Sequence, residues 1–137
     1  MTSHPPLSLR PEVRSELDRT GLRFLAEFLR RACERDGRNV EALAELGHVL
    51  TRMGRNEEGL EVDERLCALV PEDPTVHYNL ACSLALLGMG TRALEELRRS
   101  IELGYDDVDH LLGDDDLATL HGSPEFEELV EILRALH

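Results

Sequence analysis

The sequence predicts an all-α protein built from antiparallel helical hairpins, and three observations support this prediction. Residues 40–73 and residues 74–107 are successive copies of one pattern, which defines a 34-residue period. Residues that start or stop helices recur at matching places in the two segments. No segment alternates apolar and polar residues over a useful length, so no β-sheet is expected. The chain of 137 residues is long enough for one domain with its own core.

The period becomes visible when residues 40–73 are written above residues 74–107. Apolar residues and a glycine then coincide at the spacings of a helical hairpin. The aligned pairs are, in chain order, Leu46 with Leu80, Leu50 with Leu84, Gly54 with Gly88, and Leu60 with Leu94. The second half of the pattern also extends back by one period to residues 22–39, so we expect a partial unit before the two complete ones.

Helix signals divide the first unit into two helices. Asn39 is a good N-cap for a helix that runs through about Met53, and Gly54 supplies the stop. Asn56 is expected to cap a second helix. That helix must end before Pro71, which cannot continue it.

The second unit carries the same signals. Asp73 is expected to cap a helix with Pro74 in its first position, where proline is favoured. This helix should run to about Leu87 and stop at the next glycine. Thr91 is expected to cap the following helix, which ends near Leu103.

Small residues stand in the middle of the predicted helices. Gly47 and Ala81 occupy matching places on the first helices, and Gly59 and Ala93 do so on the second helices. A glycine inside a helix costs about 1 kcal/mol relative to alanine. We expect these small side chains to offset that cost by letting the two helices of a hairpin approach closely.

The first unit contains, in order, Leu43, Leu46, Gly47, Leu50, Gly54, Gly59 and Pro71. This series resembles the tetratricopeptide repeat (TPR), and the second unit matches it less tightly. The resemblance implies a right-handed α-solenoid of antiparallel hairpins, a TPR-like superhelix. Asp63 stands where the family has a large apolar residue, so its helix is expected to pack differently.

The repeat pattern predicts a single TPR-like domain over residues 1–137. Its first helix, at about residues 9–20, is degenerate. The tail after the repeats departs from the pattern and resembles the capping tail of TPR arrays, with short helical turns at about 106–112 and 115–120 and a helix from Ser123 or Pro124 to Leu136. The expected parts are a flexible N-terminus (1–8), a degenerate repeat (9–38), two repeats (40–73 and 74–107) and acidic C-terminal capping helices (108–137).

The resemblance also implies a concave groove lined by the first helix of each hairpin. Carried over residue by residue, the groove comprises Glu41, Ala44, Glu45, His48 and Arg52 from one unit and Thr75, Tyr78, Asn79, Cys82 and Leu86 from the next. These residues also lie off the apolar stripe that the periodicity assigns to the core. The acidic residues among them favour a ligand that is neutral or basic.

Tyr78 and Asn79 are the best candidates for contact with a ligand. A tyrosine offers stacking area and a hydroxyl, and an asparagine amide can pair with a peptide backbone. The alternative is that both belong to ordinary groove packing. Some TPR domains hold a C-terminal carboxylate with Lys and Asn side chains. Here Ala44 and His48 stand at two of those places and the chain has no Lys, so no such clamp is expected.

Composition argues against several classes of protein. There are 28 acidic residues against 15 basic ones, and the formal net charge is −13. Such a balance argues against a partner held by its phosphate backbone, so no nucleic acid is expected. No stretch approaches the length of a membrane span, and the N-terminus lacks the order of a secretory signal. The sequence therefore predicts a cytoplasmic protein without membrane contact.

No pattern in the chain predicts catalysis or a cofactor. The histidines are scattered, and neither a nucleophile motif nor a glycine-rich phosphate loop is present. Residues 102–137 hold eleven acidic residues against one arginine. They lack the spacing of an EF-hand, and aspartates before short helices are typical caps. We therefore expect no enzyme activity, no cofactor and no bound metal.

These observations together lead to a functional hypothesis. The chain is expected to be a protein–protein interaction module or scaffold that binds an unidentified protein or peptide in its concave groove. A rigid stack of helices loses little conformational freedom when it binds. A small acidic secretion chaperone for a client protein is the alternative. The acidic tail and the net-positive residues 1–38 also allow weak homo-oligomers through head-to-tail contact.

Overall fold

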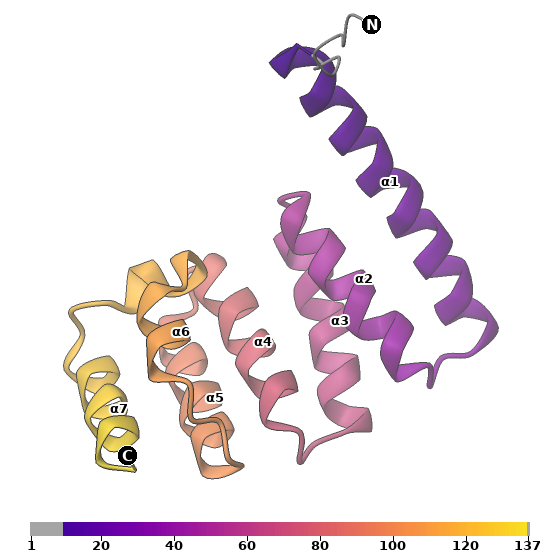
Figure 1. The fold of residues 1–137 in the computed structure, drawn as a ribbon. Helices are drawn as coiled ribbons and strands as arrows, with labels where there is room; N and C mark the ends of the chain where they lie inside the picture. The colour runs from indigo at the N-terminus through magenta and orange to yellow at the C-terminus, as the bar shows by residue number, and fades with distance from the viewer. Residues whose placement is uncertain (1–9, 137) are drawn as a thin grey trace, which may run out of the picture.

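The computed structural model describes residues 10–136, and every regular element in this range is a helix (Figure 1). This confirms the predicted all-α class. The expected flexible N-terminus, residues 1–8, lies outside the described residues. In chain order the elements are α1 (Pro11–Arg35), α2 (Val40–Arg52), α3 (Asn56–Leu69), α4 (Pro74–Leu86), α5 (Gly90–Glu102), α6 (Val108–Gly113), the 3₁₀ helix η1 (Asp115–Leu120) and α7 (Pro124–Ala135).

Each helix packs against its neighbours along the chain. The helices from α1 to α5 pack in sequence, η1 packs on α4, and α7 packs on α5 and α6 (Figure 1). Their apolar side chains form two buried clusters. One cluster joins α1, α2 and α3 and includes Val76 of α4, and the other joins α4 and α5 to the C-terminal helices. Cys67 contacts both clusters from α3.

The helix starts keep the 34-residue period to the end of the chain. The helices α2, α4 and α6 begin at residues 40, 74 and 108, and α3, α5 and α7 begin at residues 56, 90 and 124. The C-terminal segment is therefore spaced as a third unit whose first helix is divided into α6 and η1. The structure confirms the two short turns and the final helix that the sequence predicts there.

Two of the predicted N-caps, Asn39 and Asp73, are confirmed by side-chain hydrogen bonds, and Ser123 caps α7 in the same way. Asn39 accepts from the Ala42 N–H at the start of α2. Asp73 accepts from the first turn of α4, and Ser123 does the same at the start of α7. These bonds satisfy backbone donors that a helix start leaves without partners.

The caps predicted at Asn56 and Thr91 are wrong, because α3 and α5 start earlier and include both residues. The preceding turn is closed by backbone hydrogen bonds instead. After α2, the Gly54 N–H donates to the Thr51 carbonyl and the Arg55 N–H donates to the Leu50 carbonyl. Gly54 has a φ of 77°, which this C-terminal motif requires. The second helix then begins without a side-chain cap.

The close approach predicted at the small residues is confirmed in the α2–α3 hairpin. A Cβ atom added to Gly59 would lie 3.1 Å from Thr51 Oγ1, which is closer than an ordinary van der Waals contact. A Cβ atom added to Gly47 would lie 2.6 Å from a carboxylate oxygen of Asp63. The helix-propensity cost of both glycines is therefore offset by packing.

The predicted first helix at about residues 9–20 is not a separate element. A single helix, α1, spans 25 residues and passes through Gly21 without a turn. Its C-terminal half packs on α2, and its N-terminal half extends beyond the other helices (Figure 1). A glycine inside a helix is tolerated unless other signals break the helix, and none stands beside Gly21. None of the described helices has the length and apolar content needed to cross a membrane.

Candidate functional site

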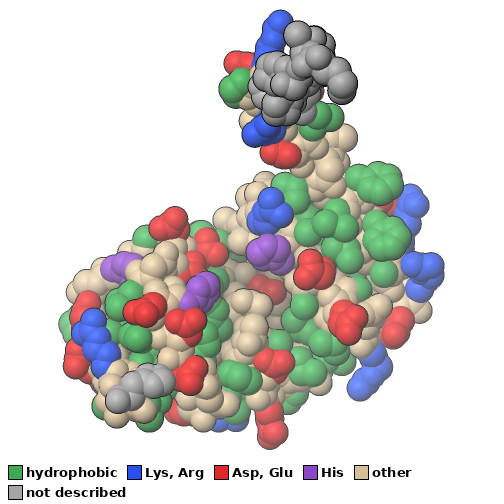
Figure 2. All heavy atoms as spheres, viewed as in Figure 1, with side chains coloured by type: hydrophobic (Ala, Val, Ile, Leu, Met, Phe, Trp, Pro, Cys, Tyr) green, Lys and Arg blue, Asp and Glu red, His purple; other side chains and the backbone are tan. Residues whose placement is uncertain are grey.

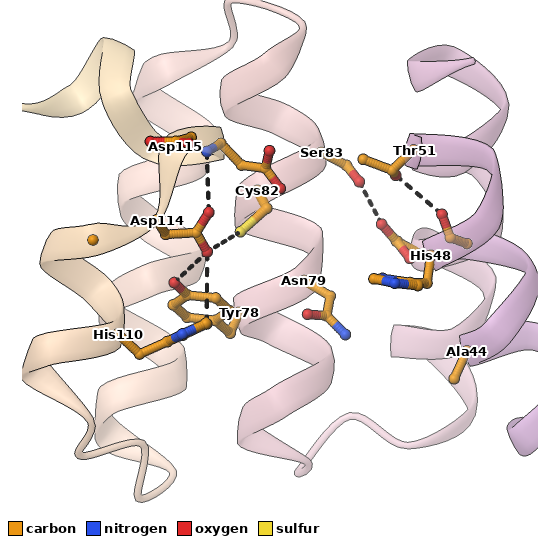
Figure 3. Close-up of a pocket in the computed structure, with 14 residues that line it drawn as sticks. Ala44, His48, Thr51, Tyr78, Asn79, Cys82, Ser83, His110, Asp114 and Asp115 are labelled. Carbon is orange, nitrogen blue, oxygen red and sulfur yellow. Dashed lines mark hydrogen bonds and ion pairs between the residues drawn. The ribbon is translucent and has the colours of Figure 1, made fainter. Parts of the chain in front are cut away.

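A cavity of about 480 Å³ lies between α2, α4 and the C-terminal segment α6–η1 (Figure 3). The first helices of two consecutive units form one side, and the divided first helix of the third unit faces them. Asp63 of α3 reaches the cavity between α2 and α4. The lining residues are Ala44, Gly47, His48, Thr51, Asp63, Tyr78, Asn79, Cys82, Ser83, His110, Gly113, Asp114, Asp115 and Asp116.

Half of the residues predicted to line a groove line this cavity. These are Ala44, His48, Tyr78, Asn79 and Cys82. The other five lie on α2 and α4 outside it, where their side chains are exposed. They are Glu41, Glu45, Arg52, Thr75 and Leu86. The structure therefore brings together part of one face of each helix and leaves Glu45, on another side of α2, and four residues nearer the helix ends outside the site.

Asp63 is a buried carboxylate in the wall of the cavity. Its side chain is 5% exposed, and Ser83 Oγ donates a hydrogen bond to Asp63 Oδ2 at 2.5 Å. Burial raises the pKa of Asp63 to about 6, and the Ser83 hydrogen bond acts in the opposite direction. Gly47 provides the space that this carboxylate occupies. Asp63 thus holds a buried position with a hydrogen bond, and the expectation that its helix packs differently stays a prediction.

Tyr78 is fixed by contacts within the protein. Its hydroxyl donates to Asp114 Oδ2 at 2.7 Å, and its ring stacks on the Tyr105 ring with 4.6 Å between centroids. Burial and the Asp114 hydrogen bond raise the pKa of the Tyr78 hydroxyl. In Figure 3, Asn79 projects into the space between α2 and α4. Its side chain is exposed, so of the two predicted contact residues Asn79 is the one whose polar group faces solvent.

The wall formed by α6 and η1 is strongly acidic. Asp114 caps η1 through the Asp116 N–H, as the sequence predicts for aspartates before short helices. Burial and the neighbouring carboxylates Asp114 and Asp115 raise the pKa of Asp116, and His48 across the cavity opposes that rise. Burial and the carboxylates of Asp114 and Asp116 also raise the pKa of the Cys82 thiol. The lining contains four aspartates and two histidines but neither Lys nor Arg.

Sequence reasoning missed this acidic wall. The sequence contains a signal that could have found it, because His48, Cys82 and Asp116 follow one another at intervals of one period and line one cavity. Extending the period to the tail would have placed Asp116 in the groove. No comparable signal points to the contact between Asp63 and Ser83, which depends on how two hairpins pack.

Two groups of side chains bring possible metal ligands within 4.8 Å of one another in the described part of the chain. One consists of Cys82, Asp114 and Asp116 in the cavity. In the other, Cys67 and Glu96 flank His77, whose ring nitrogens lie 2.6 Å from Glu96 Oε2 and 2.7 Å from the Pro71 carbonyl oxygen. Hydrogen bonds within the protein already engage atoms of both groups, and we propose no metal at either.

Comparison with known proteins identifies no family model that matches the chain. The chain is similar to a chloroplastic protein from Arabidopsis thaliana. The two sequences are 32% identical over 88 residues, which cover 62% of this chain and 26% of that protein. The matched segment thus corresponds to about a quarter of the length of the relative.

Proposed function

We propose that the chain is a short TPR-like solenoid, right-handed as the family resemblance implies. Three observations support this. The helix starts keep one period over three units, successive helices pack in order, and small residues bring the helices of a hairpin together. Repeats of this kind bury a continuous core by stacking, and a terminal helix such as α7 covers the last apolar face.

We further propose that the cavity binds a basic segment of a partner protein or peptide. The observation that carries this proposal is the buried carboxylate of Asp63 in a cavity that is lined by three more aspartates and by neither Lys nor Arg. A buried carboxylate is stabilised by a cationic partner, and charge-assisted hydrogen bonds to Arg are about twice as strong as neutral ones. The exposed amide of Asn79 lines the same cavity and can bond a peptide backbone.

The site supports binding rather than catalysis. Cys82 is the cysteine that lines the cavity, and the raised pKa of its thiol keeps it protonated, whereas the thiolate is the nucleophilic form. The Tyr78 hydroxyl is engaged by Asp114. We propose a function that rests on recognition, with no cofactor and no nucleic acid.

Selection from a random peptide display library tests this proposal. We expect the selected peptides to be enriched in Arg and Lys, and their affinity for the purified chain to fall with added salt. Enrichment of acidic peptides, or recovery of no peptide above background, would contradict the proposed ligand.

Paired variants locate the binding surface. Asp115→Asn and Asn79→Ala change exposed side chains that line the cavity. Each is expected to weaken a selected peptide by about three- to tenfold in calorimetry, which corresponds to the loss of about 1 kcal/mol. Glu45→Gln is the matched control, because it removes one charge from α2 outside the cavity. An equal loss of affinity in Glu45→Gln would show that the peptide does not bind in the cavity.

A further inference from the structure

Helix α1 has a second apolar face that nothing in the described chain covers. Its inner face packs on α2 through Ala26, Leu29 and Cys33. Its outer face carries large apolar side chains that are well exposed, namely Val13 (44%), Leu17 (54%), Phe24 (77%), Leu25 (39%) and Phe28 (56%). Figure 2 shows hydrophobic side chains gathered on the outer side of this helix. A helix that is apolar on two sides normally packs on both.

The 34-residue period identifies what this outer face corresponds to. Val13 and Phe28 lie one period before Gly47 and Val62, which meet inside the α2–α3 hairpin. A Cβ atom on Gly47 would lie 3.6 Å from Val62 Cγ1.

Leu17 and Leu25 lie one period before Thr51 and Gly59 of the same hairpin, where a Cβ atom added to Gly59 would lie 3.1 Å from Thr51 Oγ1. Four of the five exposed residues, namely Val13, Leu17, Leu25 and Phe28, are therefore those that would face one another if α1 folded into a hairpin, whereas Phe24 corresponds to the half-buried Glu58. The outer face therefore carries both sides of a hairpin interface, and these two sides do not meet because the helix is straight.

One position explains why α1 stays straight. The turns before α3, α5 and α7 each contain a glycine with positive φ, at Gly54, Gly88 and Gly122. These glycines recur once in every period, and the equivalent position in α1 is Thr20. A β-branched residue with positive φ is strongly disfavoured. Gly21 lies one position out of register, and its φ is not positive. The chain therefore continues as a helix where the other units turn back.

We infer that a second copy of this chain covers the outer face of α1, and that the two copies exchange helices. The N-terminal half of α1, residues 11–20, of each copy packs antiparallel on residues 21–30 of the other. Each copy thus supplies the missing first helix of the other copy's N-terminal hairpin. Exchange of identical elements is a low-cost route to a symmetric dimer, because it reuses contacts that one chain would make within itself.

The sequence of α1 fits the two-fold axis that such a dimer requires. The axis passes through the peptide bond between Thr20 and Gly21. Residues equally far from that bond then face each other, which pairs Val13 with Phe28 and Leu17 with Phe24 across the interface. An isologous interface repeats each of these apolar pairs twice, which favours the antiparallel arrangement.

A disulfide between positions 13 and 28 tests this inference. The full chain with Val13→Cys and Phe28→Cys is oxidised and run on a denaturing gel without reductant. We expect a covalent dimer, and light scattering of the parent chain should give twice the 15.4 kDa chain mass. The parent chain controls for the native cysteines, of which Cys33 and Cys82 are buried. Glu12→Cys with Phe28→Cys is the matched control, because residue 12 lies on another side of α1, and it should cross-link far less.

The result of the gel also distinguishes a second copy from the alternative occupants of this face. A disulfide within one chain, which leaves the variant at monomer mass, would show that α1 closes on itself and would overturn the exchange. A monomer without disulfide would leave the face to another protein and would also overturn it.

Thr20→Gly tests whether the missing turn glycine is the cause of the exchange. It restores a turn glycine at the position where the other units have one, and it is expected to weaken the dimer by about tenfold or more. An unchanged dimer in this variant would contradict the exchange.

Discussion

The hairpins α2–α3 and α4–α5 share one spacing but bury different side chains at equivalent positions. Asp63 in the first hairpin corresponds to Leu97 in the second, and they are 5% and 1% exposed. One helical turn further along, Leu66 corresponds to Ser100, and both are again buried. Each second helix therefore buries one polar side chain, but at places one turn apart.

The two polar side chains have different partners. Asp63 accepts from Ser83 of α4, which belongs to the next hairpin. Ser100 donates to the Pro74 carbonyl oxygen at 2.6 Å, which belongs to its own hairpin. The same helical framework thus carries a polar contact between units in one case and within a unit in the other. Only the contact between units lies beside the cavity.

The largest expected effect comes from Asp63→Asn, compared with the parent near pH 4 and near pH 8. The pKa of Asp63 is about 6 in the folded chain, against 3.8 for an ordinary aspartate. The folded state therefore binds the proton more tightly, so the favourable contribution of Asp63 is complete below pH 4 and is lost as the pH rises through 6. Asn does not titrate. From pH 4 to pH 8, the free energy of unfolding of the variant should therefore rise by about 3 kcal/mol relative to that of the parent.

Urea denaturation at both pH values measures this gain. Glu41→Gln is the control, because it removes an exposed carboxylate from α2 and gives the part that arises from net charge alone. A difference between Asp63→Asn and the parent that stays constant with pH would contradict the buried, ionisable position of Asp63.

The next effect concerns the glycine that makes room for Asp63. Gly47→Ala improves helix propensity by about 1 kcal/mol, but its Cβ atom would lie 2.6 Å from Asp63 Oδ1. We expect a net loss of about 1–2 kcal/mol in the free energy of unfolding. In an Asp63→Ala background the same change should stabilise the chain, as an alanine is accepted at Ala81 in the second hairpin. Equal effects in the two backgrounds would show that the carboxylate does not limit this site.

Ser100→Ala removes the corresponding contact from the second hairpin. Its hydroxyl is fully buried and donates one hydrogen bond, so the free energy of unfolding should fall by about 1 kcal/mol. The loss should not depend on pH, because neither partner ionises. Thermal unfolding at two pH values measures both properties, and a loss that grew with pH would contradict the assignment.

The smallest effect is expected at the surface of the first hairpin. Arg55 and Arg30 both bond Glu58, and the Arg55 hydrogen bond is the main cause that lowers the pKa of Glu58. The second hairpin has Met89 and Arg92 at the equivalent places and no such acid.

Glu58→Gln should therefore cost no more than about 1 kcal/mol near pH 7, because the group is partly exposed and screened. The difference should shrink in high salt and as acid protonates Glu58. A loss that is independent of salt would indicate a role in packing instead.

Much of the fold could be predicted because its signals are local. The caps at Asn39 and Asp73 and the turn glycines act within a few residues, and the period repeats them. The caps at Asn56 and Thr91 were misplaced because backbone hydrogen bonds close those turns and no side chain is needed. The continuity of α1 was missed because it depends on a glycine that is absent from its register position.

The site could be predicted only in part because its contacts join distant segments. The period placed His48 and Cys82 on one face. It could not reveal that Tyr78 donates to Asp114, far along the chain, or that Asp63 meets Ser83 across two hairpins. Such pairs are set by how whole units stack, and one sequence contains no direct record of that packing.

The division of the apolar side chains into two clusters has a consequence for how the chain opens. The clusters meet between α3 and α4, where Cys67 packs on both, Leu60 of α3 packs on the second cluster and Val76 of α4 belongs to the first. A chain divided in this way is expected to lose structure in two blocks rather than one. Amide hydrogen exchange under native conditions should show α4, α5 and α7 exchanging together and more slowly than the exposed N-terminal half of α1.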